Sequence, residues 1–313
     1  MSALVLGASG FLGRQVAARL ATRQGNEPLY SASRAKAGPG VGETHVPTDL
    51  TDPAQVRRLV ETVRPSYVYH LAGTSRVNPT ATVPDYFPSN FLTTARLLEA
   101  LEARREPVTL FFASTVHVYG NQAGLVDEAS SLRPVSPYGF TKYLAEEALR
   151  RASSRSPLLR IVIGRIYNCL GPGQSPGFVA SDLASRIAAS PSSPSTLKLA
   201  TPSSFRRFLD VRDAAEIVCL LTALGTEIHS GLETFHVASP YEKTIRELAE
   251  ALVALSGKPI QLDGDPSDGN TFLGLRLNMS KLERTLGGFQ FRPLERTLAE
   301  MMQTPENLDS GDD

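Results

Sequence analysis

Tyr138 and Lys142 are the residues of this chain whose types and spacing first suggest chemistry. They stand four positions apart in a helical pattern, which places both on one helix face with roughly 6 Å of rise between them. A nearby ammonium group favours the phenolate form of a tyrosine, so the pair is suited to proton exchange with a substrate. Ser114 and Thr115 end an apolar run, and His117 follows closely. These hydroxyls could belong to the same site, or could simply terminate a strand.

A glycine turn near the N-terminus predicts a nucleotide site. The apolar residues 4–6 lead directly into the turn, and an amphipathic helical pattern follows it. In such a turn the first glycine permits a tight bend, the second lets backbone N–H groups approach a pyrophosphate, and the third lets helix and strand pack closely. The alternative is an ordinary strand-to-helix turn. The residues expected to contact a dinucleotide here are Gly7, Ser9, Gly10, Phe11, Leu12 and Gly13.

The end of the second predicted strand bears on the choice of cofactor. An acidic residue there would bind an adenosine 2′-hydroxyl and repel a 2′-phosphate. Residues 30–34 contain no acid, and Ser33 and Arg34 could instead bind the 2′-phosphate through charge-assisted hydrogen bonds. We therefore expect NADP, with NAD possible because Arg34 could also stack on adenine.

Alternating strand and helix patterns must position these residues. Strands are predicted at 3–6, 27–31, 67–71, 109–114 and 159–165, with helices such as 53–63 and 91–104 between them. This alternation, with nearly continuous apolar strands, predicts a parallel sheet covered on both faces. After about residue 166 the pattern loosens. Helices are predicted at 213–224 and 245–255, a strand at 234–238, and a mobile loop or linker over the Ser- and Pro-rich stretch 188–204.

These patterns predict an α/β fold, a Rossmann-type doubly wound parallel sheet with a smaller C-terminal substrate-binding domain. The dinucleotide-binding domain is expected at 1–165, with a returning segment at about 206–238. The substrate-binding domain is expected at 166–205 and 239–302. Residues 303–313 are polar and acidic, and we expect a disordered tail there.

The overall composition argues against several other classes of protein. The 313 residues carry 32 basic and 32 acidic side chains, so no net charge points to nucleic acid or to an anionic membrane. No apolar run approaches the length of a membrane span, and we expect no targeting leader. Cys169 and Cys219 lie in apolar stretches, which predicts packing residues and neither a disulfide nor a metal site. We expect a soluble, cytoplasmic protein.

These motifs, in this order, resemble the extended short-chain dehydrogenase/reductases, and within them the NAD-dependent epimerase/dehydratase family that acts on nucleotide sugars. The resemblance covers nearly the whole chain. It implies a catalytic triad of Thr115, Tyr138 and Lys142, with Ser114 as a neighbour. It also places Asn90 at the start of a helix. Further cofactor contacts are implied at Asp49, Leu50, Leu71, Ala72 and Gly73.

Later motifs resemble the reductases of GDP-4-keto-6-deoxymannose and the related GDP-mannose dehydratases. The resemblance is carried by residues 165–168, 171–179 and 206–211, although Ile166 and Arg207 replace the usual proline and acid. It implies that Asn168, Arg206 and Arg276 contact a nucleotide diphosphate. The alternative is that Arg206 or Arg276 is a surface charge. The full set of implied substrate contacts is Ser114, His117, Asn168, Phe178, Val179, Arg206 and Arg276.

Position 117 separates two reactions within this family. Dehydratases place an Asp-Glu pair directly after the catalytic threonine, whereas this chain has Val116 and His117. The resemblance therefore favours NADPH-dependent reduction of the 4-keto group of a nucleotide-linked 6-deoxyhexose. Tyr138 would protonate the developing alkoxide, Thr115 would hydrogen-bond the same oxygen, and Lys142 would hold the nicotinamide ribose. His117 could bind the sugar, exchange protons near neutrality, or only line the pocket.

Two alternatives are open. The chain could be a nucleotide-sugar 4-epimerase that retains NAD, which the missing acid near position 33 disfavours. It could also be a non-catalytic nucleotide sensor, although such proteins typically lose the Tyr138 and Lys142 pair that is present here. The expected partners are a nucleotide-sugar substrate and a second copy of the chain. A homodimer is implied because relatives commonly pair through the helices that carry Asn90 and Tyr138.

Overall fold

Two compact units make up the protein, each built from three separate segments of the chain. The computed structural model describes residues 2–23, 28–35, 42–225, 231–264 and 274–303. Unit 1 comprises Met1–Tyr167, Arg212–Ala238 and Leu275–Phe289, and unit 2 comprises Asn168–Val211, Ser239–Gly274 and Gln290–Asp313. The sequence pattern predicted that residues 239–302 belong to the substrate-binding domain. In the structure, residues 275–289 of that stretch belong to unit 1.

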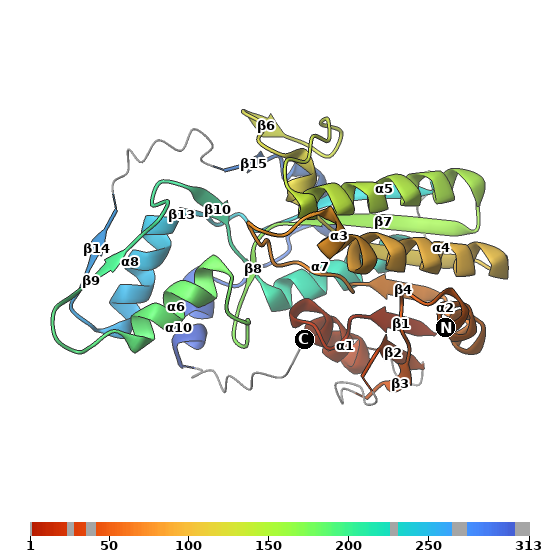
Figure 1. The fold of residues 1–313 in the computed structure, drawn as a ribbon, viewed down its shortest axis with the longest axis horizontal. Helices are drawn as coiled ribbons and strands as arrows, with labels where there is room; N and C mark the ends of the chain where they lie inside the picture. The colour runs from red at the N-terminus through yellow and green to blue at the C-terminus, as the bar shows by residue number, and fades with distance from the viewer. Residues whose placement is uncertain (1, 24–27, 36–41, 226–230, 265–273, 304–313) are drawn as a thin grey trace. The chain divides into compact units, whose positions relative to one another are not determined.

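A seven-stranded parallel sheet forms the centre of unit 1, in the order β12-β7-β5-β4-β1-β2-β3. Figure 1 labels β7, β4, β1, β2 and β3 of this sheet. Leu4 of β1 lies beside Tyr30 of β2 on one side and Val68 of β4 on the other. The doubly wound, Rossmann-type fold predicted from the sequence is therefore confirmed. The strands are β1 (Ala3–Leu6), β2 (Leu29–Ser33), β3 (Thr44–Pro47), β4 (Tyr67–His70), β5 (Val108–Thr115), β7 (Leu159–Ile166) and β12 (Leu232–Val237).

Helices cover both faces of this sheet. Apolar residues of α2, α4 and α5 join strand residues such as Leu4 and Leu110 in one buried cluster. The connection β1–α1–β2 moves across the sheet toward β3, whereas β4–α4–β5 moves toward β12. Because both crossovers are right-handed, α1 lies on the face of the sheet opposite to α4. An ion pair between Arg19 and Glu216 joins α1 to α7. The helices are α1 (Phe11–Arg23), α2 (Pro53–Val63), α3 (Val83–Phe87), α4 (Thr93–Arg104), α5 (Pro137–Arg155), α7 (Val211–Leu224) and α9 (Ser280–Leu286).

Four short elements complete this part of the chain near the site. A π-helical turn, η1 (Pro88–Leu92), leads into α4, so the predicted helix 91–104 is divided in two. A 3₁₀ turn, η2 (Val116–Tyr119), directly follows β5. The two-residue strands β6 (Leu125–Val126) and β15 (Arg276–Leu277) pair in parallel.

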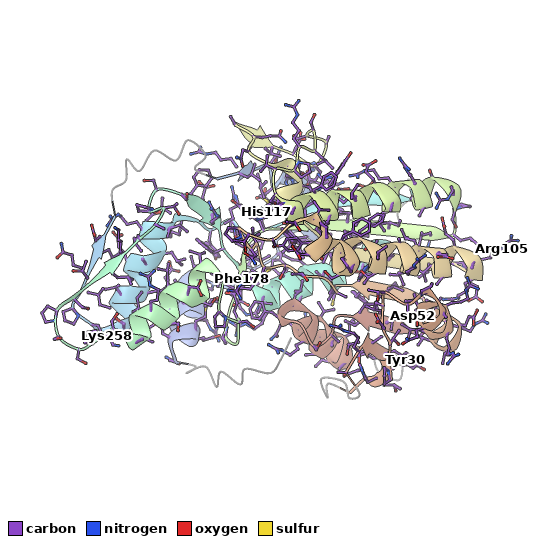
Figure 2. The ribbon with its side chains drawn as sticks, viewed as in Figure 1. Tyr30, Asp52, Arg105, His117, Phe178 and Lys258 are labelled. Atoms are coloured by element: carbon purple, nitrogen blue, oxygen red, sulfur yellow. The ribbon has the colours of Figure 1, made fainter. Side chains whose placement is uncertain are left out.

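Helix α2 shows how local sequence sets an element. Asp52 (Figure 2) accepts hydrogen bonds from two N–H groups of the first turn, at 2.8 and 3.2 Å, and Pro53 occupies the first helical position. The helix ends at Arg64, which adopts a left-handed conformation with φ of 46°. The observed bounds equal the predicted ones. The buried residues recur at helical spacing and are Val56, Leu59, Val60 and Val63.

Unit 2 packs helices around an apolar cluster of its own. Lys258 (Figure 2) donates hydrogen bonds to the carbonyls of Ile187, Ala188 and Ser190, at 3.2, 2.5 and 2.6 Å, and so closes the end of α6. The helices described are α6 (Val179–Ala189), α8 (Ile245–Ser256) and α10 (Leu294–Gln303). The strand pairs described are β8 (Cys169–Leu170) with β11 (Leu209–Asp210), β9 (Ser195–Lys198) with β14 (Ile260–Asp263), and β10 (Phe205–Arg207) with β13 (Glu242–Thr244).

Several sequence predictions need correction. The loop or linker predicted over 188–204 is wrong at β9, which pairs in parallel with β14, and wrong at its start, where α6 continues to Ala189. The strand predicted at 27–31 is β2, which runs from Leu29 to Ser33; residue 27 lies outside the described residues. Gln303 ends α10 and is not part of a tail, and residues 304–313 also lie outside the described residues.

The cysteines and the helices bear on two further expectations. Among the described residues neither cysteine forms a disulfide; Cys219 is buried and Cys169 half-buried. Burial raises the pKa of Cys169 to about 12, with Asp210 contributing in the same direction, so this thiol is protonated at neutral pH. None of the described helices combines the length and the apolar character needed to cross a membrane.

Candidate active site

The glycine turn after β1 meets the loop after β4 where the strand order of the sheet reverses. Gly7 has a φ of 84°, a left-handed conformation that glycine adopts without strain. A Cβ at this position would lie 2.7 Å from the backbone nitrogen of Ala72, so the two loops pass each other in direct contact. A Cβ on Gly13 would collide with the carbonyl oxygen of Gly7. Both positions therefore require glycine.

The N-terminus of α1 opens at this turn. The first turn of a helix leaves N–H groups without intrahelical acceptors and carries partial positive charge, which suits it to a pyrophosphate. Gly10 donates its N–H to the carbonyl of Gly7 at 3.0 Å and so closes the turn. Ser9 and Gly10 are exposed, and Phe11 and Leu12 are half-buried. These residues therefore fit one end of a dinucleotide.

Ser33 and Arg34 lie at the end of β2, and Arg34 is exposed. Hydrogen bonds from the backbone N–H of Thr51, at 2.9 Å, and from its hydroxyl, at 2.7 Å, are the main reasons that the pKa of Asp49 is lowered; the charge of Arg34 adds to them. Leu50 packs against the apolar cluster of the sheet. The Arg34 side chain and the Thr51 hydroxyl thus lie near the Asp49 carboxylate.

Tyr138 and Lys142 lie on the buried face of α5, and their residues are only 6 % and 4 % exposed. The Lys142 ammonium donates a hydrogen bond to the carbonyl of Ala113 at 2.9 Å and lies 4.9 Å from the centre of the Phe112 ring. These contacts join α5 to the last residues of β5, which ends at the buried Thr115. The structure therefore brings Tyr138 and Lys142 together with the end of β5.

His117 lies against the same helix. Its backbone N–H donates to the Thr115 hydroxyl at 3.3 Å, and its ring meets the Tyr138 ring edge to face, with 5.6 Å between centres. A Cβ on Gly139 would lie 2.6 Å from the His117 carbonyl oxygen, so η2 and α5 are in close contact. The ring of Tyr86 in α3 also contacts Tyr138, at 5.9 Å. The phenol of Tyr138 is thus held by aromatic neighbours from two elements, while His117 is exposed (Figure 2).

One short loop connects the glycine turn to Lys142. Ala72 contacts Gly7, as described above, and the next residue, Gly73, has a φ of 143°. A Cβ on Gly73 would lie 2.5 Å from Oδ1 of Asn90 and 3.2 Å from Nζ of Lys142. Residues 71–73 therefore bridge the two parts of the site.

Asn90 fixes this loop to α5. Its amide nitrogen donates to the Thr74 carbonyl at 3.1 Å and to the Thr141 hydroxyl at 3.3 Å. Thr141 in turn donates to the carbonyl of Tyr138 at 2.9 Å. The loop after β4, η1 and the first turns of α5 are thus joined by side-chain hydrogen bonds, which holds the candidate catalytic helix in a defined position.

Burial controls the charges at this site. It lowers the pKa of Lys142 to about 8, an effect that the carboxylate of Glu146 opposes. Burial also lowers the pKa of His70 to about 3, with the charge of Lys142 adding to the effect. At neutral pH Lys142 is therefore mostly protonated beside a neutral His70, whose Nε2 lies 3.0 Å from the Thr94 hydroxyl.

The residues predicted to bind substrate are divided between the units. Ser114, His117 and Arg276 belong to unit 1, and Arg276 is exposed on β15. Asn168 has a φ of 40°, and its buried Nδ2 has no hydrogen-bond partner among the described residues. Arg206 donates to the carbonyl of the preceding residue at 2.8 Å. The residues in unit 2 are Asn168, Phe178, Val179 and Arg206. Their contact with a substrate stays a prediction.

Sequence reasoning missed the buried ion pair of Glu146 and Arg165, which are 0 % and 1 % exposed. Glu146 also accepts a hydrogen bond from Ser114 at 2.5 Å, directly beside Thr115. A signal was present: Glu146 stands four positions after Lys142 and eight after Tyr138, on the helix face that carries both. A charged residue on a buried helix face demands a partner.

The fold and the site together define an oxidoreductase of the extended short-chain dehydrogenase/reductase type. Residues 3–238 match the model of the NAD dependent epimerase/dehydratase family, and the chain belongs to this family. The resemblance recognised in the motifs is therefore confirmed.

Among the curated proteins that match most of the chain are two enzymes of nucleotide-linked 6-deoxyhexoses. This chain is 31% identical over 274 residues to the dTDP-6-deoxy-L-talose 4-dehydrogenase (NAD(P)(+)) of Kitasatospora kifunensis. The match covers 85% of this chain and 83% of the relative. The chain is 30% identical over 273 residues to the GDP-6-deoxy-D-mannose reductase of Pseudomonas aeruginosa, covering 84% of this chain and 83% of the relative. The family thus includes enzymes that act on nucleotide-linked 6-deoxyhexoses.

The solved structures that share the fold include one complexed with NADPH and one complexed with NAD. The RMD protein of Pseudomonas aeruginosa complexed with NADPH has a TM-score of 0.80 and 26% identity, covering 97% of this chain and 96% of that one. The UDP-glucose 4-epimerase of Thermus thermophilus complexed with NAD has a TM-score of 0.79 and 25% identity, covering 97% and 98%. Similar structures therefore bind either nicotinamide dinucleotide.

Proposed function

We propose that this enzyme uses NADPH to reduce the 4-keto group of a nucleotide-linked 6-deoxyhexose of the GDP-4-keto-6-deoxymannose type. The observation that carries the proposal is that Lys142 hydrogen-bonds the Ala113 carbonyl near the end of β5, with Tyr138 one turn before it on α5. Val116 and His117 stand where a dehydratase would have two acids. The names of the two curated relatives, a 4-dehydrogenase and a reductase of nucleotide-linked 6-deoxyhexoses, support this reaction.

The chain's own residues supply the proton and the charge that such a reduction needs. NADPH, when bound, supplies the hydride. Tyr138 gives its phenolic proton to the oxygen that gains negative charge at C4, and Thr115 donates a hydrogen bond to the same oxygen. The ammonium of Lys142, protonated at neutral pH, stabilises the phenolate left on Tyr138 and holds the nicotinamide ribose. The low exposure of all three residues strengthens these interactions.

The preference for NADPH is assigned to Ser33 and Arg34. Arg34 is exposed at the end of β2, where an adenosine 2′-phosphate would lie in a dinucleotide bound across this sheet. The pyrophosphate is assigned to the turn from Gly7 to Gly13, and the ribose and nicotinamide side to residues 71–73. Asp49 and Leu50 complete the adenine side.

The residues assigned to the nucleotide sugar are those that the motifs imply. The buried Nδ2 of Asn168 has unused hydrogen-bonding capacity, which supports a role in binding a polar ligand. The charges of Arg206 and Arg276 suit a nucleotide diphosphate. Ser114, His117, Phe178 and Val179 are assigned to the sugar and its surroundings.

A turnover assay tests the proposal. Purified enzyme is mixed with NADPH or NADH and a panel of GDP-, dTDP- and UDP-linked 4-keto-6-deoxyhexoses, and both reduced cofactor and sugar product are measured. One NADPH should be consumed for each 4-hydroxy product. GDP-mannose should give no 4-keto-6-deoxy product, because position 117 has no glutamate to remove the C5 proton.

The same assay can overturn the proposal in favour of the epimerase. An epimerase oxidises and re-reduces its substrate, so it would interconvert two 4-hydroxy sugars without net consumption of reduced cofactor. Protein that purifies with tightly bound NAD and equilibrates such a pair would refute the reductase. Absence of turnover with every 4-keto sugar and every epimer pair would refute both reactions on these substrates.

A further inference from the structure

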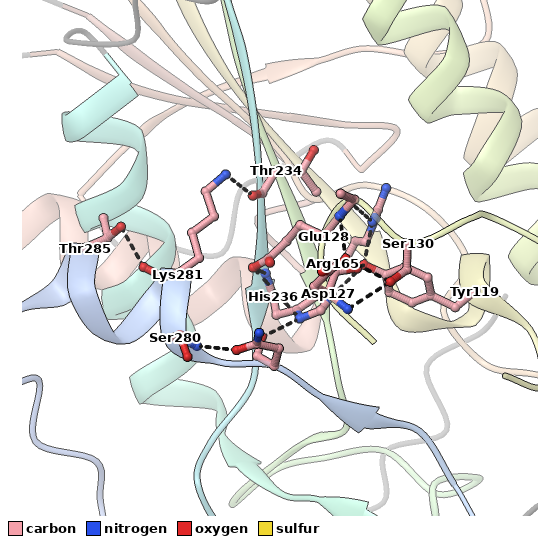
Figure 3. A network of polar contacts seen from close by, with 12 residues as sticks. Tyr119, Asp127, Glu128, Ser130, Arg165, Thr234, His236, Ser280, Lys281 and Thr285 are labelled. Atoms are coloured by element: carbon pink, nitrogen blue, oxygen red, sulfur yellow. Dashed lines mark hydrogen bonds and ion pairs between the residues drawn. The ribbon is translucent and has the colours of Figure 1, made fainter. Parts of the chain in front are cut away.

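A network of buried polar side chains lies within unit 1 beside the end of β5. Arg165 of β7 is its centre (Figure 3). It donates to the Tyr119 hydroxyl at 2.5 Å and to the Glu128 carbonyl at 3.0 Å. The Tyr119 hydroxyl in turn lies 2.6 Å from Nε2 of His236, on the neighbouring strand β12. This half of the network fixes Arg165 against η2 and β12.

Glu146 of α5 completes the network on the other side of Arg165. Two parallel hydrogen bonds join their side chains, Nε to Oε1 at 3.1 Å and Nη2 to Oε2 at 2.7 Å. Ser114 donates to the same carboxylate at 2.5 Å, and Arg150 donates at 2.9 Å. Burial would raise the pKa of Glu146, but the hydrogen bonds and charge of Arg165 outweigh it and the pKa is lowered. The carboxylate is therefore ionised at neutral pH.

This buried negative charge lies between the two elements that carry the proposed catalytic residues. Glu146 follows Lys142 by one helical turn and Tyr138 by two, on the same face of α5. Glu146 also accepts a hydrogen bond from Ser114, the residue that directly precedes Thr115. Neutral side chains could pack the same space at lower desolvation cost, so a charged pair at this point calls for a reason beyond stability.

We propose that Glu146 is a positioning residue of this enzyme: anchored by Arg165, it ties the end of β5 to α5 and supplies the negative charge that keeps the Lys142 ammonium protonated. The role rests on the proposed function, in which a protonated Lys142 supports Tyr138. Glu146 does not itself contact the reacting atoms.

The groups that face Lys142 make this assignment specific. On α5, Glu146 lies one helical turn after Lys142 and Tyr138 one turn before it, both on the same buried face; on β4 there is His70, which burial keeps neutral. From β5 the ammonium meets only the Phe112 ring and the Ala113 carbonyl among the contacts described. Arg165 lies beyond Glu146, bound to its carboxylate. Glu146 is thus the anionic group that opposes the effect of burial on Lys142.

The test is a direct titration of Lys142 by NMR. The chain has six lysines, so ¹³C labelling at their Cε atoms gives few signals, and Lys142→Met assigns the one of interest by its loss. The wild-type midpoint should lie near pH 8. In Glu146→Gln the midpoint should fall by about one pH unit or more, because a neutral amide no longer stabilises the ammonium.

Glu147→Gln is the matched control. It removes the same charge from the adjacent position, where Glu147 accepts from Arg150 at 3.1 Å and its side chain is 38 % exposed. Solvent screens this charge, so the Lys142 midpoint should stay at the wild-type value. An equal shift in both variants, or no shift in Glu146→Gln, would overturn the proposal. No substrate is needed, so this result stands apart from the failure or success of the reductase assay.

The pH dependence of kcat is a second readout, and it should not change if Glu146 has only a structural role. With Lys142 midpoints of about 8 and 7, the protonated fraction at pH 8 falls about fivefold in Glu146→Gln but is nearly unchanged at pH 6. The kcat of the variant relative to wild type should therefore recover as the pH is lowered, while KM for the sugar stays similar. A loss of kcat that is equal at both pH values would contradict the proposal.

Glu146→Gln leaves Arg165 buried without its partner, which can prevent folding. The double variant Glu146→Gln/Arg165→Met removes both charges and keeps the volume largely filled. Lys142 should still titrate below the wild-type midpoint in this variant, because the nearer of the two charges was the carboxylate. A wild-type midpoint in the folded double variant would refute the role of Glu146.

Discussion

Replacement of Gly7 by alanine tests how closely the turn after β1 approaches the loop after β4. The φ of 84° at Gly7 is left-handed, and an L-residue there costs about 1–2 kcal/mol. The new Cβ would lie 2.7 Å from the nitrogen and 2.8 Å from the Cα of Ala72. These are backbone atoms, so a change of side-chain rotamer cannot relieve the clash. Such overpacking typically costs about 1–3 kcal/mol. Reduced freedom of the unfolded chain returns about 0.4–1 kcal/mol.

The net expectation is a loss of about 1–4.5 kcal/mol in the free energy of unfolding of unit 1. Urea unfolding followed by circular dichroism measures it, with the midpoint and slope compared between variants. Gly124→Ala is the matched control: Gly124 has nearly the same φ, 85°, but nothing lies within 4 Å of its Cβ position. That variant should show the backbone strain alone, about 1 kcal/mol. Equal stability of the two variants would refute the claim that the neighbouring loop demands glycine at position 7.

Two predictions concern the proposed reaction directly. Tyr138→Phe should lower kcat by at least about 100-fold with little change in the Kd for NADPH, because only the transferable proton is lost; near-normal turnover in this variant would remove Tyr138 from the catalytic role. Arg34→Ala should weaken NADPH binding by about 1–3 kcal/mol and leave NADH nearly unchanged, because the lost partner is the 2′-phosphate. Equal losses for both cofactors, measured by fluorescence titration, would show that Arg34 binds the adenine instead.

Elements with strong local signals could be placed from the sequence. Helix α2 has a capping aspartate, a proline at its first position and apolar residues at helical spacing. Helix α8 begins at a capping box of Thr244 and Glu247 and ends at Gly257, which has a φ of 65°. In both cases the information lies within a few residues of the element itself. The five strands predicted over the first part of the chain are likewise found, with no end shifted by more than two residues.

Elements held by distant partners could not be placed. Strand β9 lies between prolines in a serine-rich stretch, and its partner β14 comes much later in the chain. Strand β3 is short and half-exposed at the edge of the sheet, so its residues show little apolar pattern. What identifies both as strands is a neighbouring backbone, which local composition does not encode.

The candidate site divides in the same way. Tyr138 and Lys142 can be recognised from their spacing on one helix, and the glycine turn from its position after a strand. The partnership of Glu146 with Arg165 depends on the register of α5 against β7, and the contact of Gly7 with Ala72 depends on the order of the strands. Both contacts follow from tertiary packing. The motifs therefore identify the candidate residues, but only the fold shows what those residues contact and how burial shifts their pKa values.

The division of unit 1 into three segments has a consequence for how the chain matures. Its last segment, residues 275–289, provides the carbonyl of Asn278, which lies 3.0 Å from Nδ1 of His236, and the ammonium of Lys281, which lies 2.5 Å from Glu233. During synthesis β12 therefore leaves the ribosome before the residues that pair with its polar groups, and at cellular elongation rates several seconds separate them. Unit 1 therefore contains β1, which is made early, yet it can be completed only after residues 275–289 have been translated.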